Sequence, residues 1–354
     1  MQIIRETEDF RIPEPTAVAI GKFDGVHMGH RKLIDTLLRQ KANGLKTAVF
    51  TFDPSPAVLF GRGGEEELST REEKRLIFGR LGVDYLVEFP LTRETAAMAP
   101  ETFVRNVLAK QMHAAYVAAG DDLSFGDRGR GNFDLLEQLS DECGYTAEEI
   151  SKVRRDGVVI SSTYIRTLVR EGMMEDVMQC CGEPYAILGT ILHGNEIGRT
   201  IGIPTLNQMP PAGKLLPPFG VYYSEVEILD GEELPAGSSG SAGESSSGDA
   251  ELPADSSGSA HEDLHPVQGR RYRGMTNIGI KPTVTAKDGL MPEEHPAVTV
   301  ETYLYGFSGD IYGKTALCSL YTFRRPERRF ATVEELKEVM QKDIEAGRHY
   351  HQTK

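Results

Sequence analysis

The stretch Gly21-Lys22-Phe23-Asp24-Gly25-Val26-His27-Met28-Gly29-His30 decides the class of fold, because it joins a strand-like run to a helix-like run. Glycines at 21, 25 and 29 would let the backbone approach a ligand closely. A helix that begins near His30 would offer free N–H groups and the positive end of its dipole to an anion. The pattern is neither a Walker loop nor a GxGxxG fingerprint. It nevertheless predicts a phosphate-binding turn between a strand and a helix.

The same alternation of strand and helix continues to about residue 184. The predicted strands are Thr16–Phe23, Leu45–Phe52, Val83–Phe89 and Ala114–Ala119. The predicted helices are His30–Ala42, Arg71–Leu81, Glu101–Met112, Phe133–Asp141 and Tyr164–Glu171. Short connections between alternating strands and helices predict an α/β domain with a parallel sheet covered by helices.

From about residue 185 onward, short runs bounded by Gly and Pro predict an antiparallel β-barrel. The predicted strands are Ala186–Leu192, Val221–Ile228, Arg273–Ile280, Val298–Leu304 and Lys314–Phe323. A C-terminal helix over Thr332–Ala346 would bury a stripe formed by Val333, Leu336, Val339, Met340 and Ile344. We therefore expect two domains, 1–184 and 185–354.

Acidity is concentrated in one segment of the 354-residue chain. Of the net charge of −14, nine negative charges fall between Asp230 and Asp263, which leaves −5 for the rest. The surrounding stretch, about 231–266, is rich in Ser, Gly and acidic residues, so we expect a disordered insertion within the barrel domain. The sequence has no basic face with interleaved aromatic residues, and binding of nucleic acid is therefore not expected.

The compartment is predicted from what the sequence lacks. No apolar run is long enough to span a bilayer, and Met1–Glu6 does not resemble the start of a secretory signal. The cysteines Cys143, Cys180, Cys181 and Cys318 form no CxxC pair, which favours reduced thiols. We expect a cytoplasmic protein without membrane contact.

Three segments of the first half are candidates for a nucleotide site at the carboxyl ends of parallel strands. His27 and His30 could donate hydrogen bonds to phosphate oxygens, and protonated imidazoles would offset negative charge. Ser161, Ser162, Thr163 and Arg166 begin a helix and could clamp a phosphate. Asp122 lies in a third, glycine-rich loop at Gly120–Gly131. The structural alternatives are a satisfied histidine pair, an N-cap at Ser162 or Thr163, and an ordinary loop.

A second glycine-rich turn lies in the other half, between His193 and Asn207. Its candidate phosphate-binding residues are Gly194, Gly198, Arg199 and Gly202. Thr205 and Asn207 alternate in an extended stretch, so both side chains would face one way with oxygen atoms that suit Mg²⁺. Glu301 lies in an alternating strand and could act as a general base. The alternatives are a Gly/Pro turn that leads into an edge strand, and a surface glutamate.

The motifs of the first half resemble the FMN adenylyltransferase (FAD synthetase) domain of bacterial bifunctional riboflavin kinase/FMN adenylyltransferases, of the Rossmann-like HxGH nucleotidyltransferase group. The matching segments are Gly21–His30, Thr51–Pro56, Gly120–Gly131 and Ile160–Arg166. The resemblance implies that His27 and His30 contact the ATP phosphates, with Ser162, Thr163 and Arg166 completing the clamp. Phe23, Asp24 and Asp122 belong to the same implied site. The family usually has a histidine where Ser55 stands and an aromatic residue where Leu123 stands.

Residues 185–350 resemble the riboflavin kinase domain of the same family. The matching segments are Gly194–Asn207, Pro218–Tyr222, Asn277–Thr283, Glu301–Gly313 and Arg324–Phe330. The resemblance implies a six-stranded antiparallel barrel, with Thr205 and Asn207 at Mg²⁺ and Glu301 as base on the ribityl 5′-hydroxyl. The family's Pro-Thr-Ala-Asn motif appears here as Pro204-Thr205-Leu206-Asn207.

Together the motifs imply a bifunctional enzyme that converts riboflavin to FMN and FMN to FAD. The expected ligands are riboflavin, FMN and ATP with Mg²⁺, and no obligate protein partner is expected. One alternative is a monofunctional riboflavin kinase with a non-catalytic nucleotide-binding first domain, which the Ser55 and Leu123 departures motivate. Another is a flavin-binding regulator or FMN carrier without catalysis.

Overall fold

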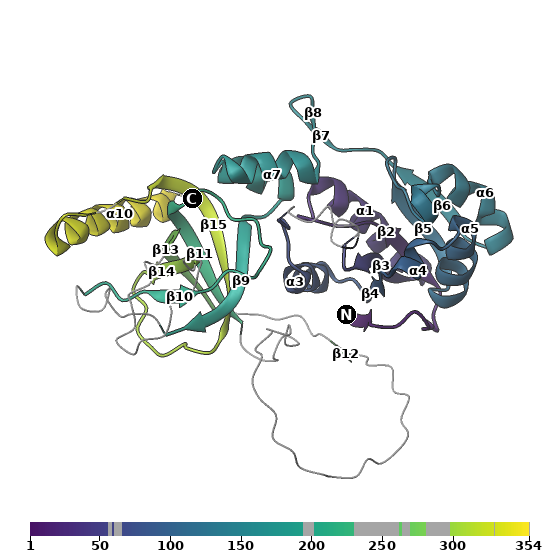
Figure 1. Cartoon of the computed structure of the whole chain (residues 1–354), viewed down its shortest axis with the longest axis horizontal. Coiled ribbons are helices and arrows are strands. Elements are labelled where there is room, and N and C mark those ends of the chain that lie inside the picture. The colour runs from purple at the N-terminus through teal and green to yellow at the C-terminus, as the bar shows by residue number, and fades with distance from the viewer. Residues whose placement is uncertain are drawn as a thin grey trace, which may run out of the picture.

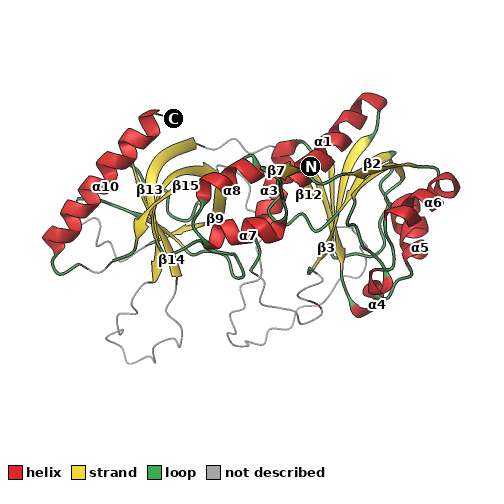
Figure 2. Cartoon of the chain, turned by 90° about the horizontal axis from the view of Figure 1, so that it is seen from above, coloured by secondary structure: helices red, strands yellow, loops and turns green. Residues whose placement is uncertain are grey.

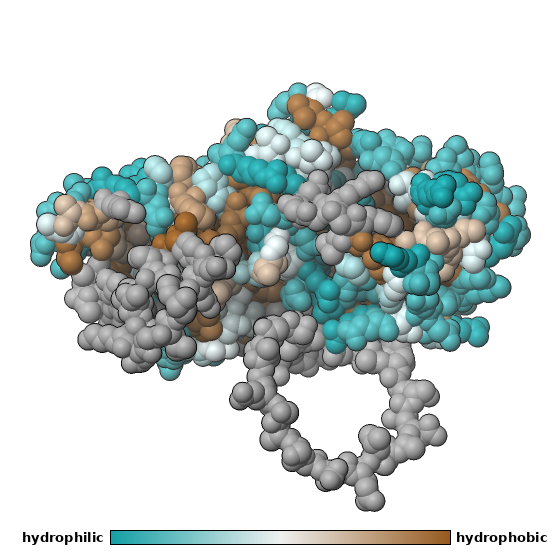
Figure 3. All heavy atoms as spheres, viewed as in Figure 1, coloured by the Kyte–Doolittle hydropathy of each residue, from teal (hydrophilic) through white to brown (hydrophobic). Residues whose placement is uncertain are grey.

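The computed structural model describes residues 1–55, 59, 66–193, 202–229, 262–263, 270–280, 298–328 and 330–353. A parallel sheet with its helices occupies one end of the molecule and a closed barrel the other, with helices α3 (Arg71–Leu81) and α7 (Ser162–Arg170) between them (Figure 1). In the described residues no helix is both long and apolar enough to cross a membrane. On the visible face the described surface is mostly hydrophilic (Figure 3).

The first half contains six parallel strands, which confirms the predicted α/β class. They are β1 (Gln2–Arg5), β2 (Thr16–Ile20), β3 (Lys46–Asp53), β4 (Tyr85–Pro90), β5 (Ala114–Gly120) and β6 (Thr146–Ile150). Their order is β1-β4-β3-β2-β5-β6, so the direction of strand addition reverses next to β2. Such a reversal opens a crevice at the carboxyl ends of the strands, where ligands bind in this kind of sheet.

Helices cover both faces of this sheet. On one face α1 (Met28–Gln40) and α3 pack Leu33, Ile34, Leu37 and Phe78 against the strands. On the other face lie α4 (Arg93–Ala96), α5 (Pro100–Thr102), the π-helix η2 (Phe103–Gln111) and α6 (Phe133–Cys143). The predicted α-helix over Glu101–Met112 is thus mostly a π-helix.

Local signals place several element ends. Thr70 caps α3 in a full capping box with Glu73. Gly44 follows α1 and the short 3-10 helix η1 (Lys41–Asn43) in the left-handed conformation. The cap of α7 is Ser161, which accepts a hydrogen bond from the Tyr164 N–H, so placing the cap at Ser162 or Thr163 was wrong.

Several short elements escaped the sequence patterns. They are β1, β6, β7 (Arg154–Arg155), the 3-10 helix η3 (Asp127–Gly129) and α8 (Met174–Cys181). Strand β6 shows why, because three of its five residues, Thr146, Glu148 and Glu149, are exposed. An edge strand of this kind carries little apolar signal for a pattern search. The strand before Ser161 is β8 (Val158–Val159), but it pairs with β7 in an antiparallel hairpin outside the parallel sheet, so the prediction that Ser161–Arg166 follow a parallel strand was wrong.

The second half is a closed antiparallel barrel with the strand order β10-β14-β13-β11-β15-β9, which confirms the predicted architecture. Its strands are β9 (Tyr185–Leu192), β10 (Leu206–Gln208), β11 (Gly220–Leu229), β13 (Arg270–Ile280), β14 (Val298–Leu304) and β15 (Thr315–Pro326). Strands β11 and β13, on either side of the acidic insertion, pair antiparallel from Gly220 with Ile278 to Ile228 with Arg270. Of the insertion itself, the described residues Glu262–Asp263 form a short strand β12 antiparallel to β1, and 231–261 and 264–266 lie outside the described residues.

The C-terminal helix α10 (Val333–Thr353) is longer than predicted and packs against β13 of the barrel (Figure 2). Thr332 accepts a hydrogen bond from the Glu335 N–H and so begins the helix as expected. The predicted buried stripe is correct at Ile344 but wrong at Val333, which is 55% exposed. The first turn extends past the barrel, so nothing covers Val333 among the described residues.

Candidate active sites

Helix α1 begins at Met28, two residues earlier than predicted, and His27 is its N-cap. The Nδ1 atom of His27 accepts a hydrogen bond from the His30 N–H at 3.4 Å. The two imidazole rings stack with centroids 3.8 Å apart and planes at 17°. The histidine pair predicted from the sequence is therefore a compact unit at the start of the helix, where the helix dipole favours an anion.

Both imidazoles are held in the neutral form. Burial lowers the pKa of His27 to about 4, an effect that the Asp122 carboxylate partly opposes. Burial also lowers the pKa of His30 well below its usual value, and the positive charge of Lys74 adds to this. The buried Nδ1 of His30 has no hydrogen-bond partner among the described residues. The protonated histidines considered from the sequence are thus not the resting state, and each ring offers an N–H instead.

Asp24 ties the loop before α1 to helix α7. Its carboxylate lies 2.6 Å from the Arg166 guanidinium, and both side chains are 15% exposed. The same carboxylate accepts a hydrogen bond from the Ser69 N–H at 3.1 Å, and the Asp24 carbonyl accepts one from the Ser162 hydroxyl at 2.9 Å. The structure thus brings Asp24, Ser162 and Arg166 together, although the guanidinium already has a carboxylate partner.

The loop before α1 is built around Phe23. This side chain is fully buried and packs edge-on against Phe78 and at a tilt against His30. Its backbone has a φ of +51°, and Gly25 has a φ of +81°. A Cβ on Gly29 would lie 3.1 Å from the His27 ring, so that glycine leaves room for the imidazole. Phe23, predicted in the phosphate site, supports that site from the core side, while Gly21 and Gly29 give space to neighbouring rings.

The glycine-rich loop after β5 is shaped mainly by packing. A Cβ on Gly126 would lie 2.8 Å from Pro100, and one on Gly131 would lie 2.6 Å from Phe125. Asp122 in this loop is 72% exposed and pairs with Lys152 at 3.2 Å. Its negative charge raises the pKa of His27, so Asp122 lies close enough to the histidine pair to act on it.

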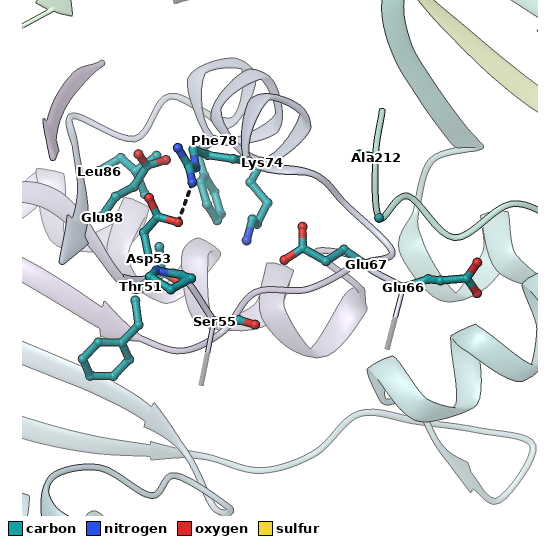
Figure 4. A pocket seen from close by; sticks show the side chains of 14 residues that line it. Thr51, Asp53, Ser55, Glu66, Glu67, Lys74, Phe78, Leu86, Glu88 and Ala212 are labelled. Carbon is teal, nitrogen blue, oxygen red and sulfur yellow. Dashed lines mark hydrogen bonds and ion pairs between the residues drawn. The ribbon is translucent and has the colours of Figure 1, made fainter. Parts of the chain in front are cut away.

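A cavity of about 420 Å³ opens at the ends of β3 and β4 (Figure 4). It is lined by Thr51, Phe52, Asp53, Pro54, Ser55, Glu66, Glu67, Arg71, Lys74, Phe78, Leu86, Glu88, Ala212 and Gly213. Lys74 extends from α3 into this space toward Glu67 (Figure 4). Burial raises the pKa of Glu67, an effect that Lys74 opposes.

The sequence patterns missed the charged residues of this cavity. Arg71 pairs with Asp53 at 2.7 Å, and deeper in the wall Arg75 forms a buried ion pair with Glu88. Arg71, Lys74 and Arg75 all follow the capping box of α3, which predicts only a helix start. Ser55, which stands where the resembling family usually has histidine, lines the same cavity.

In the barrel, register places Asn207 beside Glu301. The two residues are direct partners in the antiparallel pair β10–β14, and Glu301 also faces Asn277 of β13. Thr205 lies just before β10, two residues from Asn207, so extended backbone there would turn its side chain to the same face. Val300, Thr302 and Leu304 alternate with Glu301 and are buried, and Thr299 on the same face as Glu301 is buried as well. A carboxylate and an amide thus lie side by side, next to Leu192 at the end of β9.

Strand β10 is short but firmly held. The buried Gln208 amide donates hydrogen bonds to the carbonyls of Gly189 at 3.1 Å and Ala316 at 2.9 Å. Leu206 belongs to the barrel core. Residues on either side of Asn207 therefore anchor the strand, and the chain before it carries Thr205 into the same place.

Most of the glycine-rich turn before Thr205, including Gly194, Gly198 and Arg199, lies outside the described residues. Gly202 is described, with a φ of +77° and no other atom within 4 Å of the position that its Cβ would take. Just before the turn, His193 stacks on Tyr312 with ring centroids 3.7 Å apart.

Comparison with family models divides the chain in two. The model described as FAD synthetase matches residues 9–164, and the model described as riboflavin kinase matches residues 181–351. The first match contains the histidine pair, Asp24 and Ser162. The second contains Thr205, Asn207 and Glu301.

Individual relatives match along almost the whole length. The chain is 32% identical to the bifunctional riboflavin kinase/FMN adenylyltransferase of Listeria monocytogenes, over 94% of this chain and 91% of the relative. It is 30% identical to the protein of the same name from Escherichia coli, over 95% and 93%. A crystal structure titled as a macrolide-efflux protein from Streptococcus pneumoniae has a TM-score of 0.73 and 25% identity, and covers 98% of each chain.

Proposed function

The chain belongs to the family of bifunctional riboflavin kinase/FMN adenylyltransferases, and from this premise we propose how its residues carry out the two reactions. The enzyme phosphorylates riboflavin to FMN and then adenylylates FMN to FAD, with one domain for each reaction. We place the boundary of the domains at residues 184 and 185, between the end of α8 and the start of β9.

Adenylyl transfer is assigned to the crevice beside β2. The FMN phosphate oxygen attacks the α-phosphorus of ATP, the bond to the β-phosphate oxygen breaks, and pyrophosphate leaves. No base is needed, because the attacking phosphate is already an anion. The residues at the start of α1 and α7 align the reactants and stabilise the leaving group: the N–H groups of His27 and His30 donate to phosphate oxygens, while Arg166 supplies positive charge from its place beside Asp24. Ser161, Ser162, Thr163 and Gly25 belong to the same site.

The observation that carries this assignment is the stacked pair of neutral histidines. A buried, unpartnered imidazole nitrogen is costly in a resting protein, and His30 keeps one at the N-terminus of a helix. A bound phosphate oxygen would give the ring a partner and would also meet the free N–H groups of the helix.

The kinase reaction is assigned to the end of the barrel at Asn207 and Glu301. Glu301 removes the proton of the ribityl 5′-hydroxyl as that oxygen attacks the γ-phosphorus of ATP, and ADP leaves. Members of both domain families use ATP, generally with a divalent metal. The oxygen donors of Thr205 and Asn207 suit Mg²⁺, which keeps several waters and shares its coordination with phosphates. When bound, this ion would offset the negative charge of the triphosphate, and we propose Gly194, Gly198, Arg199 and Gly202 as its phosphate-binding turn.

The cellular setting is also a proposal. Riboflavin, FMN and ATP are small soluble compounds, and we propose that the enzyme uses them in the cytoplasm without nucleic acid, membrane or an obligate protein partner. Reduced cysteines fit that compartment, since all four are free among the described residues.

One assay tests both proposed reactions. Purified protein is incubated with riboflavin, ATP and MgCl₂, and the products are separated by chromatography. We expect FMN first and FAD later, with both lost when a chelator replaces the metal. If FMN accumulated and added FMN never became FAD, the protein would be a monofunctional riboflavin kinase. If neither product formed while flavin bound, it would be a carrier.

A further inference from the structure

A buried ion pair joins the two domains. Glu73 of α3 and Lys214 of the barrel side lie 2.6 Å apart, and their side chains are 4% and 1% exposed. The Lys214 ammonium also donates to the Leu68 carbonyl at 2.7 Å and lies 4.3 Å from the centre of the Tyr185 ring. Removing two charges from water costs several kcal/mol per ion. Because this cost can exceed the attraction between the charges, the pair is weakly explained by its contribution to holding the two domains together.

The Glu73 carboxylate is fully engaged from both domains. It accepts hydrogen bonds from the Leu188 N–H of β9 at 3.0 Å and from the Thr70 N–H at 2.9 Å. Glu73 therefore completes the capping box of α3 while it holds the edge of the barrel. A satisfied buried network of this kind favours one arrangement of its members over others.

Backbone pairing extends the contact. In the segment Glu66–Thr70, called here the bridging segment, the Glu67 N–H donates to the Gly213 carbonyl at 2.7 Å. The Leu215 N–H donates to the Glu67 carbonyl at 2.8 Å. Gly213 and Ala212 also line the cavity at the ends of β3 and β4 (Figure 4). Residues from the barrel side therefore form part of the wall of a cavity in the other domain.

On its opposite side the bridging segment touches the adenylyl-transfer site. The Ser69 N–H donates to the Asp24 carboxylate at 3.1 Å, and the Arg166 guanidinium donates to the Glu66 carbonyl at 3.3 Å. Leu68 packs so closely on the loop before α1 that a Cβ on Gly25 would lie 2.9 Å from it. Both members of the Asp24–Arg166 pair are thus held by the same segment that Lys214 holds.

We propose that Lys214, although it lies on the kinase side of the chain, is a positioning residue for adenylyl transfer. Its ammonium fixes the bridging segment, the bridging segment fixes Asp24 and Arg166, and Arg166 faces the phosphates. The inference rests on the proposed function of the crevice beside β2. It assigns to the barrel a role in the reaction of the other domain that neither family match implies.

A second link between the domains provides a matched control. Arg80 pairs with Glu227 of β11 at 2.8 Å, and the two side chains are 27% and 8% exposed. Arg80 lies at the far end of α3 from the capping box, and within the described part of the chain it forms no hydrogen bond or ion pair with the bridging segment. Breaking this pair weakens adhesion between the domains but leaves Asp24 and Arg166 in place.

The test compares full-length Lys214→Met, Lys214→Arg and Arg80→Met with the wild type. Each protein is assayed for FAD formation from FMN and ATP and, separately, for FMN formation from riboflavin and ATP. We expect Lys214→Met to lower kcat/KM for FAD formation about tenfold or more and to change FMN formation less than twofold. Lys214→Arg keeps the charge and should recover most of the loss, while Arg80→Met should leave both reactions within twofold.

Other outcomes contradict the proposal in distinguishable ways. Equal loss of both reactions in Lys214→Met, or no recovery in Lys214→Arg, would reduce Lys214 to a structural contact. If Lys214→Met does not fold, the double variant Glu73→Gln/Lys214→Met removes both charges and should fold, because a balanced removal leaves no buried lone charge. Its FAD formation must still be low. A wild type that forms FMN but no FAD would overturn the proposed function, and this inference with it.

Discussion

The two proposed phosphate sites of this enzyme are built on opposite principles. The site beside β2 gathers residues that are already engaged with one another: His27 with His30, and Asp24 with Arg166. The site at the barrel end depends instead on strand register, which sets Asn207 of β10 directly beside Glu301 of β14. In the first site the members hold one another in place, whereas in the second the strand pairing of the barrel holds them.

The contrast has a chemical reason. Adenylyl transfer needs alignment and charge stabilisation but no proton acceptor, and a site of neutral donors and a compensated arginine supplies this. Phosphorylation of an alcohol needs a proton acceptor, and we propose the half-buried Glu301 carboxylate of β14 for that role. The following changes test this division, from the largest expected effect to the smallest.

Glu301→Gln removes the proposed base but keeps the shape of the side chain. We expect kcat for FMN formation to fall about 10³-fold, within the range for loss of a general base. FAD formation from added FMN should stay within twofold. Glu225→Gln is the control, since it makes the same change on strand β11 of the barrel. If Glu301→Gln still forms FMN at the wild-type rate, the base is another group.

The register at Glu301 also shows how much of the molecule its sequence predicts. Alternation in Val298–Leu304 was enough to separate Glu301 from its buried neighbours, because a strand has a period of two. The partners of that strand could not be derived, since pairing of β10 with β14 depends on closure of the whole barrel. The same limit applies to Lys214, because nothing in the sequence around it predicts an ion pair with the distant Glu73.

Helix signals were similarly local. The Thr70 capping box and the stop at Gly44 each depend on a few adjacent residues, which a sequence pattern can contain in full. The neutral state of His27 and His30 could not be predicted, because it follows from burial by distant elements. The Asp24–Arg166 ion pair could not be predicted either, because 142 positions separate the two residues in the sequence.

His27→Asn removes one imidazole and retains an N-cap, because asparagine caps helices well. We expect kcat for FAD formation to fall about 10²-fold, as for the loss of one donor to developing charge. FMN formation should not change. His113→Asn is the matched control. His113 lies just before β5, at the amino ends of the strands and opposite the end where His27 lies, and asparagine accepts its φ of +52°. A His27→Asn enzyme with normal FAD formation would remove His27 from the reaction.

The lowered pKa of His27 links stability to pH. The folded protein binds a proton at His27 with a pKa of about 4, against about 6.5 when unfolded. The unfolded state therefore binds more protons between these values, so stability is complete above pH 6.5 and falls as the pH drops toward 4. From pH 7.5 to pH 5, His27 should account for a loss of about 2 kcal/mol in the free energy of unfolding. Denaturant titrations at both pH values should show a smaller loss in His27→Asn than in the wild type. An equal loss in both proteins would mean that His27 titrates normally.

Arg166→Lys tests the compensated arginine. Lysine can approach the Asp24 carboxylate as a point charge, but it cannot hold that carboxylate and the Glu66 carbonyl with a planar fork. We expect kcat/KM for FAD formation to fall about tenfold. Arg170→Lys, one turn further along α7 and 53% exposed, should leave it unchanged. Equal effects of Arg166→Lys and Arg170→Lys on kcat/KM would show that the contacts of Arg166 have no specific role in FAD formation.

Asp122→Asn should have the smallest effect, and its direction is informative. The side chain is exposed, and its ion pair with Lys152 contributes little in water. We expect FAD formation at neutral pH to change less than about threefold. Asp122 nevertheless raises the pKa of His27, so its removal should move the acidic limb of the pH profile for FAD formation to lower pH. Asp121→Asn offers the control, because it also contacts Lys152, at 3.4 Å, but is not among the charges that act on His27. An acidic limb that shifts equally in both variants would assign the effect to Lys152. The pH dependence of FAD formation would then come from this exposed ion pair and not from the pKa of His27.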